Sequence, residues 1–193
     1  LWLGMLTLFV YVGAEGIAGD SIIAYGIALG ISASTAKFFT TFTLMAMVFT
    51  YALGVILIPK YISQQKALQI SALLGVVFSI LILITDGFTS VLFVAALGIA
   101  NALVWPAVWP LTLVGLGKYT KTASALLIMA IAGGAIIPPL YGQLVDYGKE
   151  TLMEAGVSSS DALAISAQES YYILIPCYFI IFVFAVSAKR LQN

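Results

Sequence analysis

Apolar residues gather in six long runs that are separated by short polar connections. The runs cover residues 3–28, 38–58, 67–85, 89–115, 122–145 and 171–188. About 20 apolar residues suffice to cross a bilayer, and backbone groups in hydrocarbon must find partners within their own segment. The pattern therefore predicts an all-α integral membrane protein with six transmembrane helices.

The connection at residues 146–170 is longer than the others. We expect it to be a solvated external loop. The alternative is a pair of short surface helices, with Gly156 as the C-cap of the first and Ser160 as the N-cap of the second.

Composition agrees with a membrane protein, because 62% of the residues are hydrophobic and only 8% are charged. A soluble domain carries about 25% charged residues, so the lipid bilayer must be the solvent for much of this surface. The chain has no His and a single Cys, Cys177, which excludes Ser–His catalysis and an internal disulfide. A net charge of zero argues against a nucleic-acid partner. We expect no metal, no cofactor and no enzymatic activity.

Charge predicts the orientation of the spans. The chain starts inside an apolar run, with neither an initiating Met nor a basic segment and cleavage site, so we expect a span rather than a signal peptide. We also expect the chain to be a fragment that lacks an N-terminal part. If Leu1 is cytoplasmic, two basic residues are external, Lys37 and Lys149. The other six are then cytoplasmic, as the positive-inside rule expects. They are Lys60, Lys66, Lys118, Lys121, Lys189 and Arg190. Both chain ends are then cytoplasmic.

The first run contains two acids, Glu15 and Asp20. A carboxylate near the middle of a span costs roughly 2.5–3.5 kcal/mol on insertion scales and normally faces a cavity or a partner. Tyr11 and Glu15 are four residues apart, so they share a helical face that we expect to line a cavity. Asp20 lies on another face, among small residues, and we expect it at a helix–helix seam. The alternative for either acid is an inert role.

The fourth run offers an amide and two indoles. Asn101, Trp105 and Trp109 recur every four residues and so predict one helical stripe. Indole faces stack on the C–H faces of sugars, and an amide bonds to hydroxyls. Pro106 and Pro110 remove backbone donors and should kink this helix. The alternative is that the indoles are interfacial anchors.

The runs also differ in polarity. The third and sixth are almost wholly apolar around their circumference, and such helices can face lipid on several sides. The other four carry the polar residues, glycines and prolines, including Pro138 and Pro139, at which we expect a kink in the fifth run. The order polar, polar, apolar then repeats, as expected for a 3+3 inverted repeat.

Three stretches carry a family resemblance: YVGAEGIAGDSI (residues 11–22), NALVWPAVWPLTLVGLGKYTK (101–121) and SALLIMAIAGGAIIPPLYG (124–142). They resemble the fucose permease family of the major facilitator superfamily, and most of all its bacterial glucose/galactose transporter branch. The resemblance covers essentially the whole chain and corresponds to the C-terminal six-helix half, spans seven to twelve.

This resemblance implies a hexose permease of the bacterial inner membrane that works by alternating access. It implies coupling to protons, with sodium as the alternative ion, and an N-terminal half that supplies the rest of the sugar site. The family's aromatic-Pro signature falls on Trp105 and Pro106, and its acid on Glu15. Asp20 does not match the fucose-specific members, so the choice between fucose and glucose or galactose is open.

The predicted sugar site comprises Tyr11, Glu15, Asn101 and Trp105, with Trp105 stacking on the hexose. Glu15 accepts sugar hydroxyls or gates a proton, and Asp20 is the second candidate for coupling or gating. Alternative functions are transport of another small polar solute and a non-transporting structural or channel subunit. An anion transporter would want a basic residue deep within a span, and this chain has none.

Overall fold

The computed structural model describes residues 1–58 and 60–188, and every regular element in those residues is helical. It confirms the all-α class and six helices of membrane-spanning length. These helices cover Trp2–Ala28, Ala33–Leu57, Gln64–Ile84, Gly87–Leu113, Gly117–Glu154 and Ser159–Ser187.

Most spans are built from several helical pieces. The first comprises α1 (Trp2–Gly16), the π-helix η1 (Ile17–Ser21) and α2 (Ile22–Ala28), and the second comprises α3 (Ala33–Ala36) and α4 (Phe39–Leu57). The third is α5 (Gln64–Ile84), and the fourth comprises α6 (Gly87–Ala102) and α7 (Val104–Leu113). The fifth comprises the 3₁₀-helix η2 (Gly117–Tyr119), α8 (Thr120–Met129), the 3₁₀-helix η3 (Ala130–Ala132) and α9 (Gly133–Glu154). The sixth comprises α10 (Ser159–Glu169), the 3₁₀-helix η4 (Ser170–Ile173) and α11 (Leu174–Ser187).

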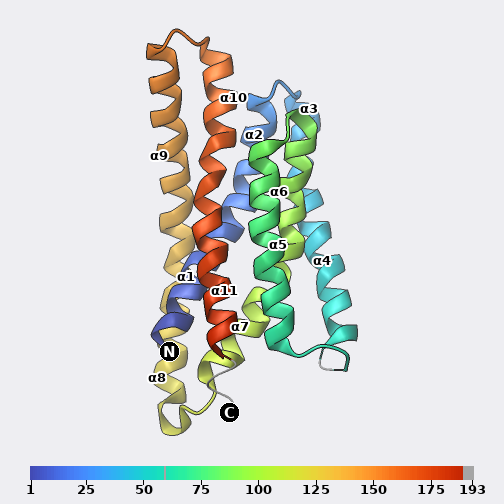
Figure 1. The fold of residues 1–193 in the computed structure, drawn as a ribbon, viewed down its shortest axis with the longest axis vertical. Coiled ribbons are helices and arrows are strands. Elements are labelled where there is room, and N and C mark those ends of the chain that lie inside the picture. The colour runs from blue at the N-terminus through green and yellow to red at the C-terminus, as the bar shows by residue number, and fades with distance from the viewer. Residues whose placement is uncertain (59, 189–193) are drawn as a thin grey trace.

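The spans alternate in direction, so the connections fall at two ends of the bundle (Figure 1). We call the end with the α9–α10 turn the upper end and the end where the chain begins the lower end. Connections 29–32, 85–86 and 155–158 lie at the upper end, and residues 58, 60–63 and 114–119 lie at the lower end. Two of the basic residues behind the predicted orientation, Lys189 and Arg190, lie outside the described residues, and the orientation stays a prediction.

The prediction of a solvated loop at residues 146–170 is wrong. Helix α9 continues to Glu154, and α10 begins at Ser159. Gly156 supplies the turn with a positive φ of 89°, and the Ser158 side chain accepts a hydrogen bond from the backbone N–H of Asp161 at 3.2 Å. Gly148 sits directly against the Ser166 side chain, so the two helices pair closely and rise above the other elements (Figure 1).

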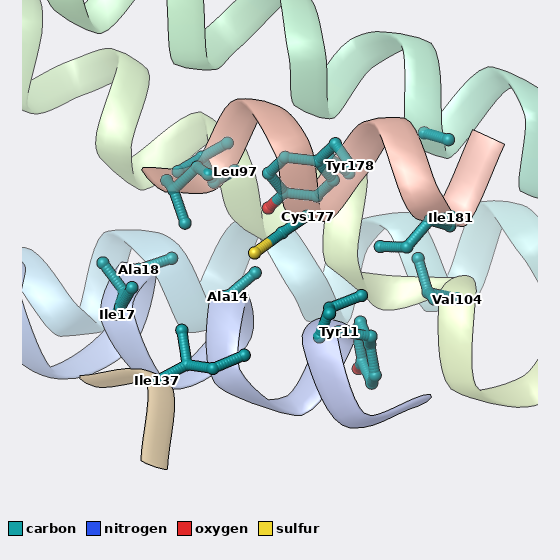
Figure 2. Close-up of a cluster of buried hydrophobic side chains, with 14 of the residues drawn as sticks. Tyr11, Ala14, Ile17, Ala18, Leu97, Val104, Ile137, Cys177, Tyr178 and Ile181 are labelled. Atoms are coloured by element: carbon teal, nitrogen blue, oxygen red, sulfur yellow. The ribbon is translucent and has the colours of Figure 1, made fainter. Parts of the chain in front are cut away.

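The core forms where α1 packs against α9 and α11, and where α6 packs against α4 and α5. A close approach of backbones makes this possible, because a Cβ on Gly133 would collide with the carbonyl of Phe9. Figure 2 shows Cys177 and Tyr178 of α11 lying near Ala14 of α1, within one buried cluster.

The apolar sixth run packs into the bundle on one side and is exposed on another, with Phe179 60% and Val186 46% accessible. In its most apolar 18-residue window, 44% of the residues are buried inside the bundle, against 17% for the second span. Tyr178 is fully buried, and its hydroxyl donates to the side chain of Asn101. A helix that is apolar all round can serve as an interior helix as well as a lipid-facing one.

Candidate functional site

The first span widens into the π-helix η1 at Ile17, two residues after Glu15. The Thr40 hydroxyl donates to the carbonyl of Gly19 at 2.8 Å. The Ser21 hydroxyl lies 2.6 Å from the carbonyl of Ile17, to which it donates, and 2.8 Å from the Tyr171 hydroxyl. Single π-turns inside α-helices cluster at functional sites. Glu15 lies before this turn and Asp20 lies within it, so the helical phase shifts between the two acids.

That shift changes the position of Asp20. The stripe of small residues begins as expected, since Gly13 sits against Ile137 and a Cβ on Gly16 would lie 3.1 Å from Pro138. Within the π-turn, however, Asp20 is exposed rather than packed at a helix–helix seam. The expectation of a seam position was wrong because it assumed a constant 100° per residue through Ile17–Ser21.

Glu15 lies in a cluster of aromatic hydroxyls at mid-span. Tyr11, one turn earlier on α1, is 1% exposed, and its side chain interacts with the half-buried Glu15 carboxyl. Tyr51 of α4 and Tyr178 of α11 also lie near enough to interact electrostatically with this carboxyl. The shared face predicted for Tyr11 and Glu15 therefore exists, but it borders a cluster drawn from three spans.

The fourth span breaks next to this cluster. Helix α6 ends at Ala102 and α7 begins at Val104, so the break at Leu103 lies just one turn before Pro106. Proline clashes with the carbonyl four residues earlier and cannot bond to it, which accounts for the position of the break. Pro110 lies within α7, and Pro138 and Pro139 lie within α9, without interrupting either helix.

The break separates Asn101 from the two indoles. Asn101 is fully buried, and its Oδ1 accepts the Tyr178 hydroxyl at 2.8 Å. Its Nδ2 is buried and has no hydrogen-bond partner among the residues that the structure describes. Asn101 is therefore enclosed in the bundle, whereas the two indoles beyond the break are half-buried. A buried, unpaired amide donor is costly and calls for an explanation.

The two indoles form a surface of their own. Trp105 and Trp109 stack with ring centroids 5.7 Å apart and an interplanar angle of 21°. The Trp105 ring also lies 6.4 Å from that of Tyr11. Both indoles line a shallow cavity of about 280 Å³ together with Pro106 and Pro110. The indoles are half-buried, so they offer aromatic faces to a ligand or a partner.

The structure thus brings Tyr11, Glu15 and Trp105 together and turns Asn101 inward. Tyr178 and Tyr51 were missed by the sequence reasoning. Tyr178 stands in a run that looks wholly apolar, and the spacing of Tyr51 within the second run carries no signal that links it to Glu15. The assembled groups are a carboxyl, phenol hydroxyls and flat aromatic faces, which suit a neutral polyhydroxylated ligand.

The known proteins that are similar to this chain are sugar transporters. No family model matches the chain. It is 31% identical over 149 residues to a glucose/galactose transporter of Brucella abortus, covering 76% of this chain and 36% of that protein. It is 25% identical to an L-fucose-proton symporter of Haemophilus influenzae, covering 76% of this chain and 34% of that protein.

A solved structure has the same fold. The crystal structure of the fucose:proton symporter of Escherichia coli matches 96% of this chain with a TM-score of 0.81 and 24% identity, and the match covers 42% of that protein. The fold is therefore that of one half of a major facilitator superfamily transporter. The relatives confirm the predicted resemblance to the fucose permease family, and this chain spans less than half of their length.

Proposed function

We propose that this chain forms the C-terminal half of a hexose transporter that moves glucose, galactose or fucose across a bacterial inner membrane together with a proton. The observation that carries the proposal is the stacked pair Trp105 and Trp109, which lines a cavity beside the membrane-embedded cluster of Tyr11 and Glu15. The names of the relatives support a sugar substrate, and two of them also name a proton.

In this proposal Trp105 stacks on the apolar face of the sugar ring. Glu15 either accepts hydrogen bonds from sugar hydroxyls or takes up and releases the coupled proton, and Tyr11 supports it. Asn101 reaches the sugar only if the α6–α7 break rearranges, because its amide is buried against Tyr178 in this structure. Asp20, being exposed, is a second candidate for gating. Alternating access requires a second six-helix half, since one bundle must rock against another.

The test is uptake of labelled glucose, galactose and fucose by the full-length transporter in proteoliposomes, with and without an inward proton gradient. We expect one of these sugars to accumulate and the gradient to accelerate its uptake. Glu15→Gln should keep the shape of the side chain but remove the dependence of uptake on the gradient. Glu150→Gln, an exposed acid near the end of α9, is the matched control and should behave like the wild type.

One result would overturn the proposed function, and a second would overturn the role of Glu15. Failure to transport any hexose in vesicles that contain folded protein would remove the substrate class. Unchanged gradient dependence in Glu15→Gln would remove this acid from coupling and leave Asp20, or the other half, to carry the proton. A sodium gradient that replaces the proton gradient would keep the sugar assignment and change the coupling ion.

A further inference from the structure

A second cavity lies on the lower part of the bundle, between two spans that are consecutive in the chain. Helices α4 and α5 both pack on α6, and the groove between them has a volume of about 190 Å³. Leu53 and Leu57 of α4, Ile70 and Leu74 of α5, and Leu103 at the α6–α7 break line it. Gly54 forms part of its floor, because a Cβ there would collide with Leu103.

This groove must be filled by something apolar. It lies within two membrane-spanning helices, and its outer rims are exposed, with Leu53 39% and Ile70 50% accessible. Apolar cavities of this kind do not hold water. Its size suits a stretch of one acyl chain rather than a bulky folded segment.

The groove extends to the lower end of the bundle, where two basic residues neighbour its lining residues in the chain. Ile62 and Ala67 belong to its lining, and Lys60 and Lys66 are exposed beside them. The Lys60 ammonium lies 5.2 Å from the centre of the exposed Tyr61 ring, as is typical of residues at a membrane interface. The chain contains no acidic residue from position 21 to position 85, so this segment supplies no anion of its own.

We propose that this groove binds an anionic phospholipid, with an acyl chain between α4 and α5 and the phosphodiester on Lys60 and Lys66. Basic pockets between transmembrane helices are recognised sites for anionic headgroups. Here both exposed lysines lie within two residues of the lining residues Ile62 and Ala67 in the chain, so a single lipid would satisfy the groove and the cations together. The site is distinct from the sugar-binding region around Trp105 and does not depend on the proposed transport function.

The test is native mass spectrometry of the purified protein in detergent, titrated with phosphatidylglycerol or with phosphatidylcholine of the same acyl chains. We expect the wild type to retain the first phosphatidylglycerol at least fivefold more strongly than phosphatidylcholine. Lys60→Gln combined with Lys66→Gln should abolish this preference. Lys118→Gln combined with Lys121→Gln changes two lysines at the same end, one in η2 and one in the first turn of α8, and it should retain the preference.

A second pair of variants tests the groove itself. Ile70→Trp should fill the groove and weaken retention of the first phosphatidylglycerol severalfold. Leu73→Trp, on the same helix and equally exposed at 50% but outside the groove lining, should not. Circular dichroism and a monodisperse elution profile confirm that each variant is folded. Equal retention of both lipids by the wild type, or equal losses in the two Trp variants, would overturn the proposal.

Discussion

The upper part of the bundle and the region around Trp105 differ in how their buried polar groups are satisfied. In the upper part, hydroxyls and amides bond across helices. Tyr25 donates to Ser90 at 2.8 Å, and Ser90 in turn donates to the carbonyl of Ile82. Further cross-helix bonds join Tyr141 to Ala167, Ser166 to Val145, and Gln168 to Ile82 and Thr85.

Near Trp105 the polar groups are only partly satisfied. Asn101 uses its oxygen but not its buried nitrogen, and the helix beside it is interrupted at Leu103. The upper part is therefore fixed by the protein itself, whereas the region near Trp105 keeps hydrogen-bonding capacity for a ligand or for another arrangement. This difference indicates that the upper part has a structural role and that the region near Trp105 has a functional one. Variants in the two regions should therefore behave differently.

The largest expected effect on stability is that of Ser90→Ala. The change leaves the buried Tyr25 hydroxyl without its acceptor and removes the donor to Ile82, which should cost about 1–3 kcal/mol. The free energy of unfolding, measured by titration with a denaturing detergent, checks this. Ser79→Ala is the matched control, because Ser79 is equally buried but bonds only within its own helix. Equal losses in both would show that the cross-helix bonds do not brace the upper part.

Trp105→Ala should affect ligand affinity more than stability. It removes one of the two stacked indoles beside the cavity, and we expect the Kd for the transported sugar to rise roughly tenfold, about 1.4 kcal/mol. Isothermal titration calorimetry measures this Kd. The Kd of Trp105→Phe should lie between those of the wild type and Trp105→Ala. Trp2→Ala removes an exposed indole in the first turn of α1 and should not change the Kd. A Trp105→Ala variant that loses stability but keeps its affinity would make this indole a packing residue.

The double variant Asn101→Leu with Tyr178→Phe should change stability by less than about 1 kcal/mol. Both hydrogen-bonding partners become apolar together, and the unpaired Nδ2 disappears. Asn101→Leu alone should be less stable than the double variant, because it leaves the Tyr178 hydroxyl buried without its acceptor. The free energies of unfolding of the three proteins check this. If the double variant is stable but no longer transports, the amide has a functional rather than a structural role.

The smallest expected effect is that of Thr40→Val, which removes the hydroxyl that bonds to Gly19 in the π-turn. Hydrogen bonds between membrane helices contribute on average about 0.6 kcal/mol, so global stability should hardly change. Amide hydrogen exchange within Ile17–Ser21 should nevertheless accelerate, and Thr40→Ser should restore the slow rate. Unchanged exchange in Thr40→Val would show that this bond does not hold the π-turn.

The six spans were predictable because the length of an apolar run directly reflects the thickness of the bilayer. The loop at residues 146–170 was not, because charged and polar residues such as Lys149 and Glu150 suit a solvated helix as well as a solvated loop. Helices α9 and α10 support each other by close packing, in which Gly148 contacts the Ser166 side chain. Packing between two helices has no signature in the local sequence of either one.

The candidate site was predictable only where it depends on one helix. Tyr11 and Glu15 share a face because they are four residues apart, and that spacing holds in α1. Asn101 and Trp105 have the same spacing but are separated by the break at Leu103. The π-turn likewise moves Asp20 to an exposed position. Periodicity assumes an uninterrupted α-helix, and it fails at the interruptions that shape this site.

The paired helices α9 and α10 have a practical consequence for imaging. The helical stretch Gly117–Glu154 has 38 residues, or roughly 57 Å at 1.5 Å per residue, which exceeds the whole bilayer of about 40–45 Å. The α9–α10 tip rises above the other elements (Figure 1), so it should stand clear of a detergent micelle. The Ser166 hydroxyl joins α10 to α9, and the Gln168 side chain joins α10 to the carbonyls of Ile82 and Thr85 at the end of α5. An antibody fragment raised against this tip would act as a fiducial that moves with the bundle, giving particle alignment in electron cryomicroscopy a fixed external reference.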